Sequence, residues 1–140
     1  MTVFTRPFAN ATLPLVKSIV TDILEEGRAL RRYISAHGES SDSHEEYRMR
    51  NRILQRYIEE LEDLGCIYAD YSFSVGTVHF PALFHDCEVF MSWHLGEDEI
   101  LYYHEVREQE SHRRAIPGEY LQPEGGMEGG ARVEYETWLA

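Results

Sequence analysis

Apolar residues in the first half of the chain recur at the spacing of an amphipathic helix. From Thr12 the steps alternate between three and four residues, and this heptad seam predicts one long helix over residues 12–36. Thr12 is the expected N-cap, with Pro14 in the first turn, and Thr5 can cap a separate short turn upstream. Gly27 is expected to let another backbone approach the seam. The seam consists of Leu13, Val16, Val20, Ile23, Gly27, Leu30 and Ile34.

A second helix is predicted over residues 43–64. Ser43 and Glu46 have the spacing of a capping box, in which each side chain accepts from the other residue's backbone N–H. Gly65 is the expected stop at the other end. The intervening loop, residues 37–42, is short enough to force the two helices into an antiparallel hairpin.

After Gly65 the apolar spacing changes to two, which is the period of a strand. It predicts strands over residues 75–80, 87–94 and 99–106. We expect a turn with an even number of residues between the last two predicted strands. Trp93 and His104 then lie on the same face of the sheet, so we expect the His104 side chain to point toward the core.

These elements together predict an α+β fold, in which a long antiparallel helical hairpin is followed by a small antiparallel β-sheet of about three strands. The length of 140 residues suits one domain, which we assign to residues 1–117. Residues 118–140 are rich in glycine and acidic side chains and are predicted to form a C-terminal extension.

The charge of the chain narrows the expected partners. The net charge is -12, and residues 71–140 alone carry 4 basic and 13 acidic side chains. Because Lys and Arg supply the affinity for phosphates and for anionic lipids, we expect neither nucleic acid nor membrane as a partner. With no secretory signal and no long apolar run, a cytoplasmic location is expected. Cys66 and Cys87 are expected to be free, buried thiols.

Several short motifs, in order along the chain, resemble those of DUF2203, a family of uncharacterised bacterial and archaeal proteins. The segments concerned are Thr5, Leu13-Pro14, 65–66, 78–82, 88–97, 103–105 and Arg113. The resemblance extends over residues 4–117, supports the architecture and implies no activity. The chain departs from the family pattern at four positions. His79 replaces an acidic residue, Ser92 replaces Cys, Asp98 replaces Pro and Tyr103 replaces Trp.

Five of the seven histidines lie between positions 79 and 112, together with several glutamates. Imidazole and carboxylate are ligands for zinc, iron, nickel or manganese, so a divalent metal is a candidate cofactor. The spacing does not favour it, because the segment 104–108 begins like HExxH but has Glu108 in place of the second His and lies on a predicted strand. The candidate ligands are His94, His104, Glu105 and His112.

The same region suggests an acid/base site. His104 could exchange protons, with Glu97 and Arg113 as the other candidate catalytic residues. Trp93 and Tyr102 are the candidate ligand-binding residues, although both would also suit the core or its rim.

Two functions are therefore predicted. The first is protein association without catalysis, as a homodimer formed through the helical hairpin, because one partner helix cannot cover both the seam and the flanking Leu15, Ile19 and Leu24. The alternative is a small enzyme or metal-dependent ligand-binding protein, with a site around His104, Glu97, Trp93 and Arg113.

Overall fold

The structure is a computed structural model that describes residues 2–38, 41 and 43–121. Its first element is a long helix, α1 (Arg6–His37). Its N-cap is Thr5, whose side chain accepts a hydrogen bond from the backbone N–H of Phe8. The prediction of a start at Thr12 was wrong, because Thr12 lies inside the helix and its hydroxyl donates to the Ala9 carbonyl at 2.7 Å. The expected short turn and the long helix are one continuous element that includes Pro14.

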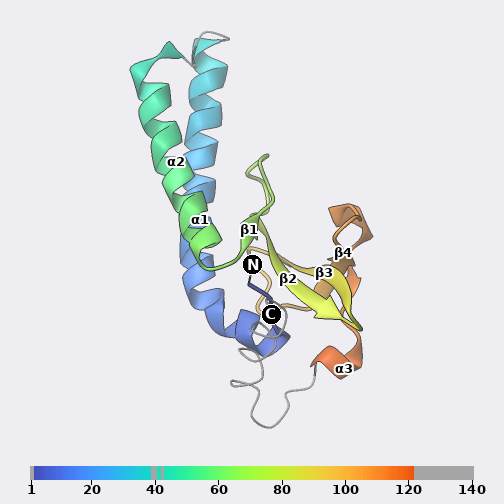
Figure 1. Cartoon of the computed structure of the whole chain (residues 1–140). Coiled ribbons are helices and arrows are strands. Elements are labelled where there is room, and N and C mark those ends of the chain that lie inside the picture. Colours follow the sequence, from blue (N-terminus) through green and yellow to red (C-terminus); the bar gives the residue numbers. More distant parts are fainter. Residues whose placement is uncertain (1, 39–40, 42, 122–140) are drawn as a thin grey trace.

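The second helix, α2 (Glu45–Asp63), lies beside α1 along its length (Figure 1). Its N-cap is His44, whose side chain makes no capping hydrogen bond, so the capping box expected from Ser43 does not set the helix start. The His44 ring instead contacts α1, with Nδ1 2.7 Å from the Tyr33 hydroxyl. None of the helices in the described part of the chain is long and apolar enough to cross a membrane.

The strands form one antiparallel sheet in the order β1-β2-β3-β4-β5. Five strands replace the predicted three because β1 and β5, of two residues each, are too short to show an alternating pattern. The strands are β1 (Ile67–Tyr68), β2 (Thr77–Phe84), β3 (Cys87–His94), β4 (Tyr102–Glu105) and β5 (Arg114–Ala115).

Strand β2 continues through Pro81 rather than ending there. The Pro81 carbonyl accepts from the Phe4 backbone N–H at 2.7 Å, so this residue directs its backbone groups away from β3. On that side β1 pairs only as far as His79, and the missing N–H of Pro81 therefore breaks no ladder hydrogen bond.

The face on which His104 lies was predicted wrongly. His104 is opposite Phe90, and Tyr102 is opposite Ser92, so these side chains lie on the face away from Met91 and Trp93. The connection spans an odd number of residues, 95–101, and not the even number assumed. Within this connection the Ile100 backbone N–H donates to Asn10 Oδ1 on α1, at 2.8 Å, so Ile100 contacts the helix and does not belong to β4.

The other face of the sheet carries the core. Val78, Phe80, Met91 and Trp93 are buried there in one cluster with the apolar residues of α1 and α2. The indole N–H of Trp93 donates to the Glu97 carbonyl at 2.9 Å, so this fully buried ring has its polar atom satisfied.

Burial differs from expectation at three other positions. Ile19 and Leu24, which were expected to need a partner molecule, are buried within the chain, whereas Leu15 is exposed. Both thiols are free, but only Cys66 is buried, and Cys87 is exposed at the start of β3.

Arg6, the first residue of α1, contacts the distant end of the described chain. Its guanidinium donates to the Ile100 carbonyl at 2.6 Å, to the Leu121 carbonyl at 3.1 Å and to Glu99 Oε1 at 3.1 Å. Leu121 ends α3 (Gly118–Leu121), with which the predicted C-terminal extension begins; its residues 122–140 lie outside the described residues.

Gly27 on α1 faces an aromatic ring and not the backbone that was expected. A Cβ atom at Gly27 would lie less than 3 Å from atoms of the Phe73 ring. Phe73 has a positive φ of 55°, and its carbonyl accepts from Arg28 Nε at 2.9 Å. The absence of a side chain at Gly27 is therefore what lets this loop lie on α1.

The same loop is organised by the Asp70 carboxylate. Its oxygens accept from the backbone N–H groups of Ser72, Ser74, Val75 and Gly76 and from the Ser72 hydroxyl. Burial acts to raise the pKa of Asp70, but these donors outweigh it and lower the pKa to about 2.

Asp70→Asn is expected to lower the free energy of unfolding by about 2 kcal/mol at pH 7. The folded-state pKa lies below the usual 3.8, so the carboxylate stabilises the fold above about pH 4, and this contribution disappears as the pH falls toward 2. Urea unfolding of both proteins at pH 7 and pH 3 measures it. A difference between them that does not shrink at pH 3 would show that the hydrogen bonds to the ionised group are not its source.

Candidate functional site

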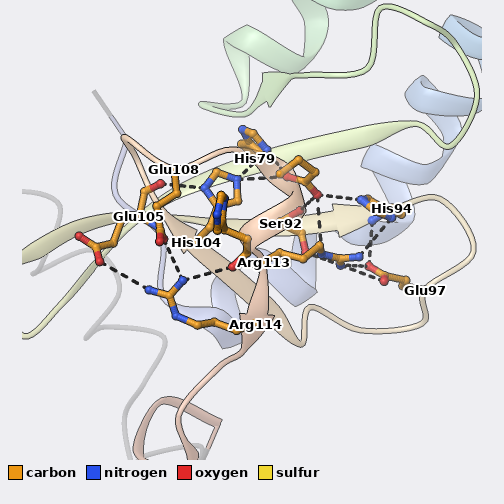
Figure 2. Close-up of polar contacts among 11 residues, drawn as sticks. His79, Ser92, His94, Glu97, His104, Glu105, Glu108, Arg113 and Arg114 are labelled. Atoms are coloured by element: carbon orange, nitrogen blue, oxygen red, sulfur yellow. Dashed lines mark hydrogen bonds and ion pairs between the residues drawn. The ribbon is translucent and has the colours of Figure 1, made fainter.

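Three histidines surround one carboxylate on the sheet face that carries Phe90. They come from neighbouring strands, with His79 on β2, His94 on β3 and His104 on β4, and Figure 2 shows their rings together with Ser92. The carboxylate belongs to Glu110, the first residue of the 3-10 helix η2 (Glu110–His112) between β4 and β5. We call His79, His94, His104 and Glu110 the histidine cluster.

The two oxygens of Glu110 have different surroundings. Oε2 accepts from the Ser92 hydroxyl and lies 2.8 Å from His94 Nε2. Oε1 lies 2.9 Å from His79 Nε2 and 3.1 Å from His104 Nε2, and these two nitrogens are 3.4 Å apart. One oxygen is thus anchored by neighbouring donors, while the other meets two ring nitrogens.

The partners of the remaining ring nitrogens fix where the protons lie. Arg113 only donates, so His94 Nδ1, 3.1 Å from that guanidinium, is an acceptor, and its Nε2 carries the proton shared with Glu110. A carbonyl only accepts, so His104 Nδ1, 2.8 Å from the Glu105 carbonyl, must carry a proton. In a neutral His104 ring, Nε2 therefore has a free lone pair.

That lone pair faces a negative charge. Burial acts to raise the pKa of the Glu110 carboxyl, but the hydrogen bonds from His79, His94 and Ser92 outweigh it, and the pKa lies well below its usual value. An ionised carboxylate only accepts hydrogen bonds. His79 Nε2 lies 2.9 Å from Glu110 Oε1 and 3.4 Å from His104 Nε2, so either the His79 ring proton or a metal ion can bridge the three atoms.

Arg113 and Glu97 support the cluster from one side. Arg113 NH2 donates to both oxygens of Glu97, at 2.8 and 2.9 Å, and to the Ser92 carbonyl at 3.1 Å. The guanidinium also lies over the Tyr102 ring, 4.3 Å from its centroid. Since Glu97 Oε1 accepts from the His94 backbone N–H at 2.9 Å as well, this ion pair holds His94 in position.

The structure separates the other candidate residues from the cluster. Trp93 is buried on the opposite face of the sheet. The Glu105 carboxylate is exposed and pairs with Arg114, at 3.5 Å, and only its carbonyl reaches His104. His112 is exposed and contributes no atom to the cluster.

Three residues of the site, His79, Ser92 and Glu110, were not among the candidates predicted from the sequence. His79 had been counted among the five histidines between positions 79 and 112 but not chosen as a ligand, and Ser92 had been noted only as a departure from the family pattern. The pairing of β2 with β3 places the two residues opposite each other. Glu110 lies in a segment without apolar periodicity, so no signal in the sequence indicated that it reaches across the sheet.

Comparison with known proteins gives one match. A family model described as an uncharacterised conserved protein, DUF2203, matches residues 2–116, which include the whole histidine cluster. No curated protein matches the chain, and no solved structure does.

Proposed function

The chain belongs to the DUF2203 family, whose description assigns no activity, and from the geometry of its own side chains we propose that it binds a divalent transition metal ion through His79, His104 and Glu110. The observation that carries this proposal is the position of His104 Nε2. Its ring partner Nδ1 is committed to a carbonyl, and Nε2 points at an ionised carboxylate oxygen and at a second imidazole.

The spacing of the three atoms suits a small ion. Two ligands that are each 2.0–2.1 Å from a tetrahedral zinc ion lie about 3.3 Å apart. The corresponding separations here are 2.9, 3.1 and 3.4 Å, so small side-chain movements would complete the site. Two imidazoles and one carboxylate are a ligand set used by zinc hydrolases and by non-haem iron proteins.

The surroundings of these atoms supply the second layer of a metal site. Metal-bound histidines usually donate their other N–H to a carbonyl or carboxylate, as His104 does to Glu105. Ser92 and His94 hold the distal oxygen of Glu110 and so fix its orientation. Three protein ligands leave at least one position for water or a small molecule, which supports the metal-dependent, ligand-binding alternative predicted from the sequence.

Isothermal titration of chelator-treated protein with zinc tests the proposal. We expect about one ion per chain, bound with micromolar or tighter affinity at pH 7.5, because the donors are already gathered. His112→Ala is the matched control, since it removes a nearby histidine outside the cluster and should leave zinc binding unchanged. Protein that takes up no zinc, or a His112→Ala variant that loses it, would contradict the assignment.

A second candidate function is self-association through the helices. It is favoured by apolar side chains that remain exposed, including Met49 and Ile53, which lie one turn apart on α2, and Ile34 on α1. The far ends of both helices also project beyond the sheet (Figure 1). Homodimerisation through this surface is what we propose.

Sedimentation equilibrium measures the association. We expect a mass of twice the 16.3 kDa of one chain, and a return to the single-chain mass when Met49 and Ile53 are both replaced by glutamate. A single-chain mass at every concentration would exclude the dimer, whatever the result of the zinc titration.

A further inference from the structure

An apolar hollow of about 240 Å³ lies on the same sheet face as the histidine cluster. Ile67, Pro81, Phe90 and Val106 are among its lining residues. The strand register places Ile67 opposite His79, and Pro81 is two positions further along β2, so both side chains are on the face of the cluster. The hollow and the histidine cluster are therefore neighbours on one continuous surface.

Phe90 joins the two. It is opposite His104 in the β3–β4 pair, and its ring stacks on His79 with the centroids 4.8 Å apart. The same residue forms part of the hollow's wall. Same-face residues two apart on a strand are separated by about 7 Å, so Pro81 and Phe90 in the wall of the hollow lie one such step from His79 and Ser92.

The chemistry of the wall defines the occupant. Among the residues that line the hollow, only Glu88 is charged, and the others are apolar. Displacing water from such a surface favours an apolar group. A volume of about 240 Å³ is below the 300–1,000 Å³ of typical drug-sized pockets, so the group is small.

The charge of the metal site defines the other end of the molecule. A divalent ion held by two neutral imidazoles and one carboxylate keeps one net positive charge, which favours an anionic oxygen donor at the open position. Arg113 is already engaged by Glu97 and by Ser92, so the ion itself is the group that would receive this donor.

We propose that the site takes a small amphiphilic molecule, with an oxygen-donor head group on the metal and an apolar portion of a few carbons in the hollow beside Phe90. This inference rests on the proposed metal site. It adds a substrate class that the three metal ligands alone do not define.

Two probes that share a head group test the inference. Acetohydroxamate and hexanohydroxamate chelate a metal equally but differ by four methylene groups. With cobalt-loaded protein, whose visible absorption reports the metal's ligands, we expect hexanohydroxamate to bind on the order of hundredfold more tightly, since each buried methylene contributes about fourfold. Equal affinities would overturn the hollow as a binding site while leaving the metal site intact. Failure to take up cobalt would instead overturn the metal site itself.

A substitution at the hollow gives a second measurement. Val106→Trp places a larger side chain at an exposed lining position, so it should reduce the preference for the longer probe to within a few-fold and leave the acetohydroxamate affinity unchanged. Val75→Trp, at a similarly exposed position outside the hollow, is the matched control and should keep the preference. A Val106→Trp variant that keeps the full preference would contradict the proposal.

Discussion

Replacing Glu110 by glutamine is expected to lower the zinc affinity by about thousandfold or more. Loss of a residue that only supports a metal ligand typically lowers affinity 10- to 100-fold, and Glu110 is itself a proposed ligand and the one acidic member of the histidine cluster. The glutamine amide has only one oxygen that can accept or bind a metal, and its NH2 group only donates. Either Ser92 and His94 or the metal therefore loses the oxygen that it contacts in the wild-type protein. Competition with a chromophoric chelator at pH 7.5 measures the change.

Two further variants define how that result is interpreted. Ser92→Ala removes one donor to the distal oxygen and should weaken zinc binding by about 10- to 100-fold, between wild type and Glu110→Gln. Glu119→Gln is the control, because Glu119 also pairs with a histidine, His85, at 2.6 Å but lies outside the cluster. A Glu110→Gln variant that binds zinc within tenfold of wild type would show that the ion is held elsewhere.

Gly27→Ala is expected to lower the free energy of unfolding by about 3 kcal/mol, although alanine is the better helix former by about 1 kcal/mol. The added methyl group would overlap the Phe73 ring, which sits in a loop held by Asp70 and Arg28 and cannot move freely. Chemical denaturation followed by circular dichroism measures the change. Helix propensity alone predicts that the substitution raises the free energy of unfolding. A decrease would therefore show that overlap with the Phe73 ring dominates.

A double-mutant cycle separates the ring from other causes. In a Phe73→Ala background the overlapping atoms are gone, so Gly27→Ala should be neutral or stabilising by up to about 1 kcal/mol. If Gly27→Ala is equally damaging in both backgrounds, the steric account of this position is wrong.

The helices could be predicted from the sequence because the regular spacing of apolar residues continues over many turns, even where a single residue departs from it. The seam from Leu13 to Leu30 is buried as expected, whereas its last residue, Ile34, is exposed. The starts of both helices were misplaced, that of α1 by six residues and that of α2 by two. Pro14 is compatible with a first turn, but the helix starts about two turns earlier, at the hydrogen bond that the Thr5 side chain accepts from the Phe8 N–H. A rule about proline position could not reveal which of two threonines is the cap.

The burial of His104 was predicted, but for the wrong reason. The residue is 1 % exposed, yet its side chain lies on the face opposite Trp93 and is covered by the segment that contains Glu110. The error came from the connection before β4, in which Ile100 donates a tertiary hydrogen bond to Asn10 on α1 and lies outside the strand. The alternation of side chains along the strands contains no information about a contact with a helix ninety residues away.

The site was predicted only in part because its residues are assembled across the sheet. His104, Glu97 and Arg113 were identified as candidates, and the structure places all three in or beside the cluster. His79 and Glu110 lie 31 residues apart in sequence and meet only when β2, β3 and β4 pair. No local spacing could relate them, since metal-ligand motifs indicate a site only when one element or turn supplies two ligands.

The guanidinium of Arg6 has a consequence for how the protein forms during synthesis. Helices α1 and α2 make contacts between neighbouring stretches of sequence and can pair as soon as both have left the ribosome. Arg6, by contrast, donates hydrogen bonds to the carbonyls of Ile100 and Leu121. These bonds at the start of α1 can form only after nearly all the described chain has been synthesised. Glu110, the last residue of the histidine cluster, appears in that same final interval, so the proposed metal site would be completed only after the helices have paired.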